Sequence, residues 1–448
     1  MSSENLPIDI VNHIMSFLRS DIVTLRTCAE IHPILFDLSE RYIYANVTLC
    51  DNLYDLSSPT DLRTSEFTQI LARRPDIANH VRSLEVVCVN GDPGSEQHEV
   101  TSSHLDDVAS LLPMFAELTR FTITGILNDF YFSWHSMPET FCQAFLYCLH
   151  TQVIMEDIVI SCIAFFSMSL LNNCKNVRVT FDYCPEVQFD KKSTISEDVS
   201  QSYPVPFDHI SIIRSETSME NIAAWVKSHG LRSLGCEAIE FTTSFQRLLV
   251  ACSGSLTDLC LDTKYCTFSV ANFYHSKSEA HFICFSASEI NSSYQISDES
   301  TIHNEKISLF PFTLANLRHL TRLTIDTNSR MCYSDASRTP LYSPIPAIAE
   351  LLSTAPPTLK EVSIKFNFTF SGLAFEHDPV VIWFPFIPLA ARCASASISV
   401  YISPSFCIRN SEEKFSPGFF TSFADYKGLT PYVQSGVVVI SEAVFEDS

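Results

Sequence analysis

Residues 320–328 read LTRLTIDTN, and residues 359–367 repeat the pattern as LKEVSIKFN. Apolar side chains stand at the first, fourth and sixth positions of both segments, and polar or charged residues fill most of the places between them. Alternation of this kind is typical of a β-strand that buries one face. Each segment therefore predicts a short strand, followed closely by Asn328 or Asn367.

The same spacing of apolar residues recurs at five further places in the chain. It starts at Val81, Leu118, Cys174, Phe207 and Leu256. Helix-like segments precede four of the seven predicted strands, over residues 104–117, 165–171, 245–252 and 345–353. A repeated unit of helix, turn and strand is typical of an α/β solenoid, whereas a single non-repeating α/β domain is the alternative.

The spacing of these units is irregular. Successive starts lie 33 to 64 residues apart, whereas a regular leucine-rich repeat has about 20–29 residues. We therefore expect polar insertions between the units. The segments richest in Ser and acidic residues cover 90–102, 185–203, 265–307 and 328–343. Polar segments of this length are expected to form surface loops or disordered segments.

Three short helices are predicted in the first 45 residues. Pro7 can open the first helix, because the missing N–H of proline costs nothing at a helix start. Ser20-Asp21 offers an N-cap for the second helix, and Pro33 can open the third. Val47-Thr48-Leu49 then predicts a strand. A module this small has a marginal core, so we expect it to pack on another surface.

Residues 6–49 resemble an F-box. They read LPIDIVNHIMSFLRSDIVTLRTCAEIHPILFDLSERYIYANVTL. Ile10, Ile14, Phe17 and Leu18 recur at helical spacing and predict one apolar stripe. The positions that match the family pattern are Leu6, Pro7, Ile10, Ile14, Leu18, Leu25 and Cys28. F-boxes commonly carry a basic residue and a Trp after the second helix, and residues 29–36 of this chain contain no Trp. The whole chain looks like the fungal, basidiomycete-type F-box proteins that carry diverged leucine-rich repeats.

The resemblance implies an α/β fold in which a three-helix F-box precedes an irregular leucine-rich-repeat-like solenoid. The expected divisions are 1–48 for the F-box, 49–405 for the solenoid and 406–448 for an extension with an acidic tail. The implied function is that of a substrate-recognition adaptor in a Skp–cullin–F-box ubiquitin ligase.

In such an adaptor the F-box binds a Skp-type linker, and through it a cullin–RING ligase, while the solenoid binds a protein substrate. The expected linker contacts are Leu6, Pro7, Ile10, Ile14, Phe17, Leu18, Leu25 and Cys28. Two alternatives stay open. The N-terminal helices could cap the solenoid of an interaction scaffold without ligase function, or the chain could be a hydrolase whose catalytic residues form no local motif.

Composition disfavours several classes of function. The chain has only ten glycines among 448 residues, and no glycine-rich nucleotide-binding motif is present. A formal net charge of −22 disfavours binding to a phosphate backbone. We therefore expect no catalytic residues, no cofactor and no nucleic-acid partner.

The cysteines predict a reducing compartment and no metal site. There are sixteen, without any C-x-x-C pair. The N-terminus lacks the basic flank and apolar run of a secretory signal, so a cytoplasmic or nuclear location is expected. The apolar run 158–171 is shorter than the roughly 20 residues of a membrane span, and no membrane association is expected.

Overall fold

The computed structural model forms two compact units, residues 1–202 and 203–448, and each is described by itself. The described residues are 7–19, 21–50, 61–89, 96–126, 131–151, 154–171, 174, 177–188, 207–215, 218–237, 243–263, 268–269, 283–284, 312–332, 345–371, 386–409, 428–441 and 444–447. Within this part of the chain, no helix is long and apolar enough to cross a membrane.

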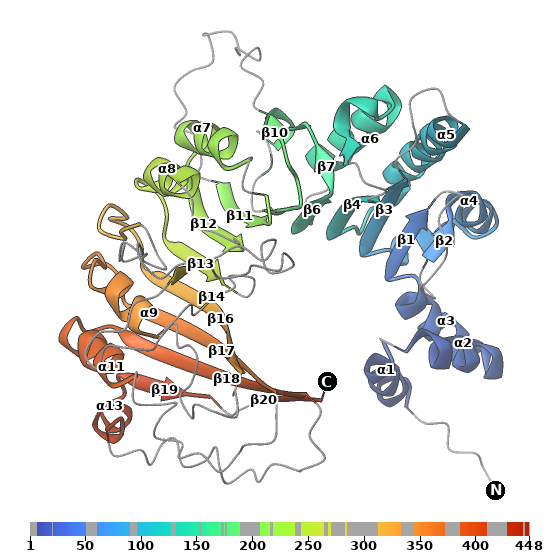
Figure 1. Cartoon of the computed structure of the whole chain (residues 1–448). Coiled ribbons are helices and arrows are strands. Elements are labelled where there is room, and N and C mark those ends of the chain that lie inside the picture. The colour runs from blue at the N-terminus through green and yellow to red at the C-terminus, as the bar shows by residue number, and fades with distance from the viewer. Residues whose placement is uncertain are drawn as a thin grey trace, which may run out of the picture. The chain divides into compact units, whose positions relative to one another are not determined.

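Three helices open the first unit, as the sequence predicts (Figure 1). They are α1 (Ile8–Phe17), α2 (Ile22–Ile31) and α3 (Pro33–Ile43). Asp21 is the N-cap of α2, and its carboxylate accepts hydrogen bonds from the Thr24 backbone N–H at 3.0 Å and hydroxyl at 2.6 Å. The ring of His32 caps α3 by accepting from the N–H of Ile34. The three helices are called the helical module below.

A parallel sheet follows, in the order β2-β1-β3-β4-β6-β9 within the first unit. Its strands are β1 (Asn46–Cys50), β2 (Asp61–Arg63), β3 (Ser83–Val89), β4 (Arg120–Ile126), β6 (Asp157–Ser161) and β9 (Arg178–Asp182). The strands predicted from Val81, Leu118 and Cys174 are β3, β4 and β9. Leu84, Phe121 and Ile158 lie in register and are fully buried, as the alternation requires.

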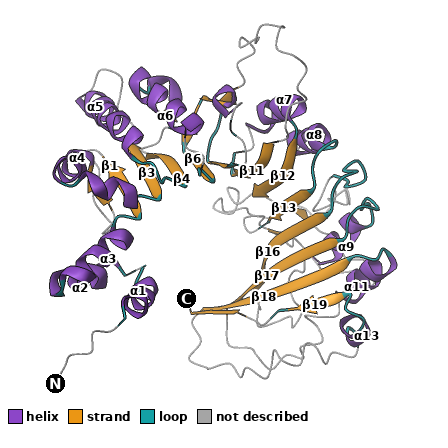
Figure 2. Ribbon diagram, turned by 180° about the vertical axis from the view of Figure 1, so that it is seen from behind, coloured by secondary structure: helices purple, strands orange, loops and turns teal. Residues whose placement is uncertain are grey.

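Connections between parallel strands must cross from one end of the sheet to the other, and helices supply several of these crossovers. In the first unit they are α4 (Thr64–Arg73), α5 (Glu96–Leu111) and α6 (Glu139–Thr151), which lie along one face of the strands (Figure 2). Shorter elements complete the unit. They are the 3₁₀ turns η1 (Pro75–His80), η2 (Leu112–Met114), η3 (Trp134–Ser136) and η4 (Met168–Leu171), and the two-residue strands β5 (Phe132–Ser133), β7 (Ile163–Ala164), β8 (Phe166–Ser167) and β10 (Val187–Gln188).

The second unit repeats the arrangement. Its main strands are β11 (Phe207–Ile213), β12 (Leu231–Glu237), β13 (Asp258–Asp262), β16 (Arg322–Cys332), β17 (Glu361–Ser371) and β18 (Ser399–Arg409), all parallel and adjacent in that order. β19 (Val438–Ile440) and β20 (Val444–Asp447) both pair with β18. The helices are α7 (Met219–His229), α8 (Thr243–Cys252), α9 (Ile345–Leu352), α11 (Phe386–Ser395) and α13 (Thr430–Gln434), and β14 (Phe268–Ser269) pairs antiparallel with β15 (Ile283–Cys284).

Strand predictions in this unit are confirmed at Phe207, Leu256, Leu320 and Leu359, which lead into β11, β13, β16 and β17. The two predicted asparagines, Asn328 and Asn367, occupy the same register position on neighbouring strands. The expected boundary at residue 405 falls inside β18, whose pairing with β19 and β20 continues the sheet into the C-terminal segment.

Several sequence predictions are wrong in detail. The helix expected at 165–171 is replaced by β8 and η4. The loop expected at 90–102 contains the start of α5, because helix formation extends back to Glu96. β16 continues through 328–332, where a loop was expected, because its ladder with β17 extends to Cys332. Residues 90–95, 189–203 and 333–343, and most of 265–307, lie outside the described residues.

Candidate functional site

The helical module has a small core of its own. Met15, Ile22, Leu25 and Leu38 are buried together. Partly buried side chains pack around them, namely Val11, Leu18, Cys28, Leu35, Tyr42 and Ile43. Three of the expected linker contacts, Leu18, Leu25 and Cys28, therefore hold the helices to one another. Leu25 has no exposed surface, so any effect of this residue on docking acts through the fold of the module.

Three of the remaining expected contacts lie on a second, exposed face of α1 beside the one that packs into the core. Ile10, Ile14 and Phe17 are 48%, 49% and 73% exposed. Their spacing of four and three residues places them along one side of the helix, and the ring of His13 lies against Phe17 with centroids 4.8 Å apart. Pro7 is also exposed, and Leu6 lies outside the described residues. The helix thus has two apolar stripes, one buried and one facing solvent.

Five further side chains of the helical module are apolar and exposed, and were not expected from the sequence. They are Ile8, Val23, Ile31, Ile34 and Phe36. Of the fifteen exposed large apolar side chains in the described residues, eight lie between Ile8 and Phe36. Such clustering marks interaction surfaces, since single exposed apolar residues are ordinary but groups of them are rare. The apolar run around His32-Pro33 was the available signal, because it exceeds what a three-helix core can bury.

Comparison with known proteins is negative. No known family model matches the sequence, and a search of curated proteins found no similar chain. The side chains and their geometry therefore carry the case for a function.

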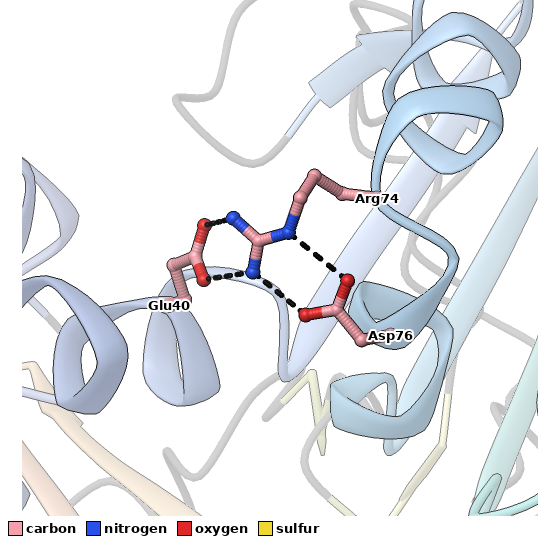
Figure 3. A network of polar contacts seen from close by, with 3 residues as sticks. All are labelled: Glu40, Arg74 and Asp76. Atoms are coloured by element: carbon pink, nitrogen blue, oxygen red, sulfur yellow. Dashed lines mark hydrogen bonds and ion pairs between the residues drawn. The ribbon is translucent and has the colours of Figure 1, made fainter.

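An ion-pair network joins the helical module to the segment where α4 ends and η1 begins (Figure 3). Glu40 on α3 accepts two hydrogen bonds from the guanidinium of Arg74, at 3.4 and 3.0 Å. The same guanidinium donates to Asp76 at 3.0 and 2.6 Å and lies 5.9 Å from the centre of the Phe36 ring. Glu40 is buried, with a side chain only 8% exposed. The network therefore neutralises a carboxylate that would be costly to bury alone.

Backbone hydrogen bonds reinforce the same junction. The carbonyl of Ala45, just after α3, accepts from the N–H groups of Arg82 and Ser83, both at 2.9 Å. Because β1 starts at Asn46 and pairs with β3, the last turn of α3 passes directly into the sheet. The helical module is thus attached by a covalent link, a backbone pairing and a side-chain network.

Metal ligands and buried thiols can be examined in the part of the chain that the structure describes. In this part, no group of three or more His, Cys, Asp or Glu residues could hold a metal ion. Burial raises the pKa of the Cys148, Cys184 and Cys252 thiols to about 12. These thiols stay protonated at neutral pH, and the protonated thiol is a poor nucleophile.

Proposed function

We propose that this chain is a substrate-recognition adaptor of a Skp–cullin–F-box ubiquitin ligase. The observation that carries the proposal is the exposed apolar face of Ile10, Ile14 and Phe17 on a module whose core is already closed. Here the helical module is the F-box, and the parallel strand–helix units are diverged leucine-rich repeats that hold a protein substrate.

The energetics favour a large partner surface. Covering the part of the three α1 side chains that is still exposed would contribute about 3–5 kcal/mol. Association itself costs about 4–15 kcal/mol in lost translational and rotational freedom. A Skp-type linker that covered this face alone would bind weakly, so we expect Ile31, Ile34 or Val23 to be covered as well.

The adaptor would supply no chemistry of its own. It would hold a substrate beside the ligase, so that transfer of ubiquitin to a substrate lysine becomes effectively intramolecular. Substrate would bind the face of the strands that carries no helices, or the loops at its edges. The partner ligase and its linker would provide the reactive groups.

Retention of a Skp-type linker by the full-length chain tests the proposal. Wild type is expected to retain the linker, and Ile14→Asp/Phe17→Asp is expected to lose it, because two carboxylates cannot be desolvated on an apolar partner. Val250→Asp is the matched control, since Val250 is 55% exposed on α8 in the other unit. Failure of wild type to retain any linker would remove the adaptor function.

A scaffold without ligase function is the second candidate. The Glu40–Arg74–Asp76 network favours the scaffold function, because the network attaches the helical module to the rest of the unit as an N-terminal cap would be attached. Under this hypothesis the α1 double variant and wild type both fail to retain the linker. The proposal would then reduce to a protein-interaction domain capped by three helices.

A further inference from the structure

A cavity of about 440 Å³ lies where the helical module meets the first strands. Its walls come from α2, α3, β1 and β2, all in the first unit. Cavities of about 300–1,000 Å³ with mixed lining are typical of small-molecule sites. The volume is therefore at the lower end of this range and suits one compact organic molecule.

The apolar part of the lining could receive the body of such a molecule. It comprises Ala29, Phe36, Ile43, Val47 and Leu62. Tyr44 lies beside them at the end of α3, and its pKa is raised, first by burial and then by the charge of Glu40. The hydroxyl therefore stays protonated and can donate a hydrogen bond.

The charged part of the lining favours a cation. Glu30 and Glu40 contribute carboxylates and Arg26 contributes one guanidinium, while Arg74 and Asp76 stand behind Glu40. The lining itself thus holds two carboxylates and one guanidinium, a formal net charge of −1. One cation is already accommodated here, because the guanidinium of Arg74 binds Glu40 and lies over the ring of Phe36. The same two features, a carboxylate and an aromatic face, are what an amine or guanidine requires.

We propose that this cavity binds a small organic cation, with its apolar body against Phe36 and Leu62 and its ammonium or guanidinium group toward Glu30, the lining carboxylate that Arg74 does not bind. The site is independent of the adaptor function. Because α2 and α3 form one side and β1 and β2 the other, the bound cation would link the helical module to the sheet. Binding is therefore expected to raise the melting temperature of the full-length chain.

Isothermal titration calorimetry of the full-length chain tests this site with three probes that share an aromatic body and differ in charge. The cation 2-phenylethylamine is expected to bind at one site. The neutral 2-phenylethanol and the anion phenylacetate, which share its aromatic body, are expected to bind at least about tenfold more weakly. Absence of saturable binding of the amine, or equal binding of all three probes, would overturn the proposal.

Substitutions inside and beside the lining locate the binding. Ala29→Trp fills the cavity from α2 and is expected to abolish binding, whereas Thr27→Trp, an exposed position on the same helix outside the lining, is expected to leave it unchanged. Glu30→Gln keeps the shape and is expected to weaken binding by about threefold, the effect of a partly exposed ion pair. If Ala29→Trp does not fold, Asn46→Trp fills the cavity from β1. Unchanged binding in a folded filling variant would contradict the proposed site.

Discussion

At the scale of single residues, Gly125 shows how closely the strands and loops of the first unit approach. A Cβ at this position would lie 2.6 Å from the carbonyl oxygen of Cys162 and 2.9 Å from the Cβ of Phe132. The first neighbour is a backbone atom and the second is bonded directly to the backbone, so neither can move without shifting the main chain. The absence of a side chain is thus a packing requirement of β4.

Gly125→Ala is therefore expected to destabilise the chain by about 1–3 kcal/mol, the cost of overpacking a core. The measurement is the urea midpoint followed by circular dichroism. Gly254→Ala is the control, because nothing lies within 4 Å of its added Cβ, and it is expected to be neutral or slightly stabilising. Equal effects of the two substitutions would contradict the close approach.

Arg74 is expected to stabilise the folded chain mainly by compensating the buried charge of Glu40. Arg74→Met leaves the buried Glu40 carboxylate without its guanidinium and is expected to lower the urea midpoint. Adding Glu40→Gln removes the uncompensated charge, so the double variant is expected to be more stable than Arg74→Met alone. A double variant less stable than the single one would show that charge is not the cause.

The same network predicts a pH dependence. The guanidinium of Arg74 holds the pKa of Asp76 below its usual range through a hydrogen bond. A carboxyl whose pKa is lower in the folded state stabilises above its unfolded pKa, near 4, and loses this contribution as pH falls through the folded value.

The urea midpoint of wild type should therefore exceed that of Asp76→Asn at pH 7, and the difference should shrink below about pH 4. In the Arg74→Met background the same substitution should have a smaller effect that varies less with pH. If the difference between the two urea midpoints grew on acidification, the pKa of Asp76 would be raised by folding and the prediction would be wrong.

At the scale of elements, α1 contains two neighbouring residues with opposite roles. Met15 is 2% exposed in the core of the helical module, whereas Ile14 is 49% exposed. Met15→Ala is expected to cost about 2–5 kcal/mol of stability. Ile14→Ala should change stability by no more than about 0.5 kcal/mol and should weaken retention of the linker. Chemical denaturation and pull-down, performed on the same two variants, measure the two effects separately.

Sequence patterns predicted eight strands correctly, including β1 at Val47-Thr48-Leu49, and missed others for identifiable reasons. β6 is a continuous apolar run, Ile158-Val159-Ile160, which has no period and cannot be told from a buried helix. β12 does follow the pattern with Leu231, Leu234 and Cys236, but Gly235 in its centre is unfavourable for a strand and hid the signal.

The candidate site was only partly readable from sequence. α1 is apolar on two faces, with Val11, Met15 and Leu18 toward the core and Ile10, Ile14 and Phe17 toward solvent. Helical spacing groups residues onto a face but does not say which face packs inward. Leu18 was consequently grouped with the wrong stripe. The Glu40–Arg74 pair was not predicted, because the two residues lie 34 positions apart without a shared motif.

At the scale of the whole molecule, the net charge is expected to make the stability depend on salt. A charge of −22 makes the folded chain repel itself, and salt screens this repulsion. The melting temperature is therefore expected to rise as NaCl increases from about 10 to 150 mM, where the Debye length falls to about 8 Å. Differential scanning fluorimetry measures the change. A falling melting temperature would mean that ion pairs such as Arg178–Asp157 outweigh the repulsion.

The pairing of β13 with β16 joins Asp258 to Arg322, which are 64 residues apart in sequence, whereas β12 and β13 join Ser233 to Asp258 across 25. Loop-closure entropy grows only with the logarithm of length, so the longer connection costs about 0.8 kcal/mol more than the shorter one. Doubling it again would add only about 0.6 kcal/mol. An inserted epitope or fluorescent reporter of a given length is therefore expected to cost less in this connection than in the one between β12 and β13.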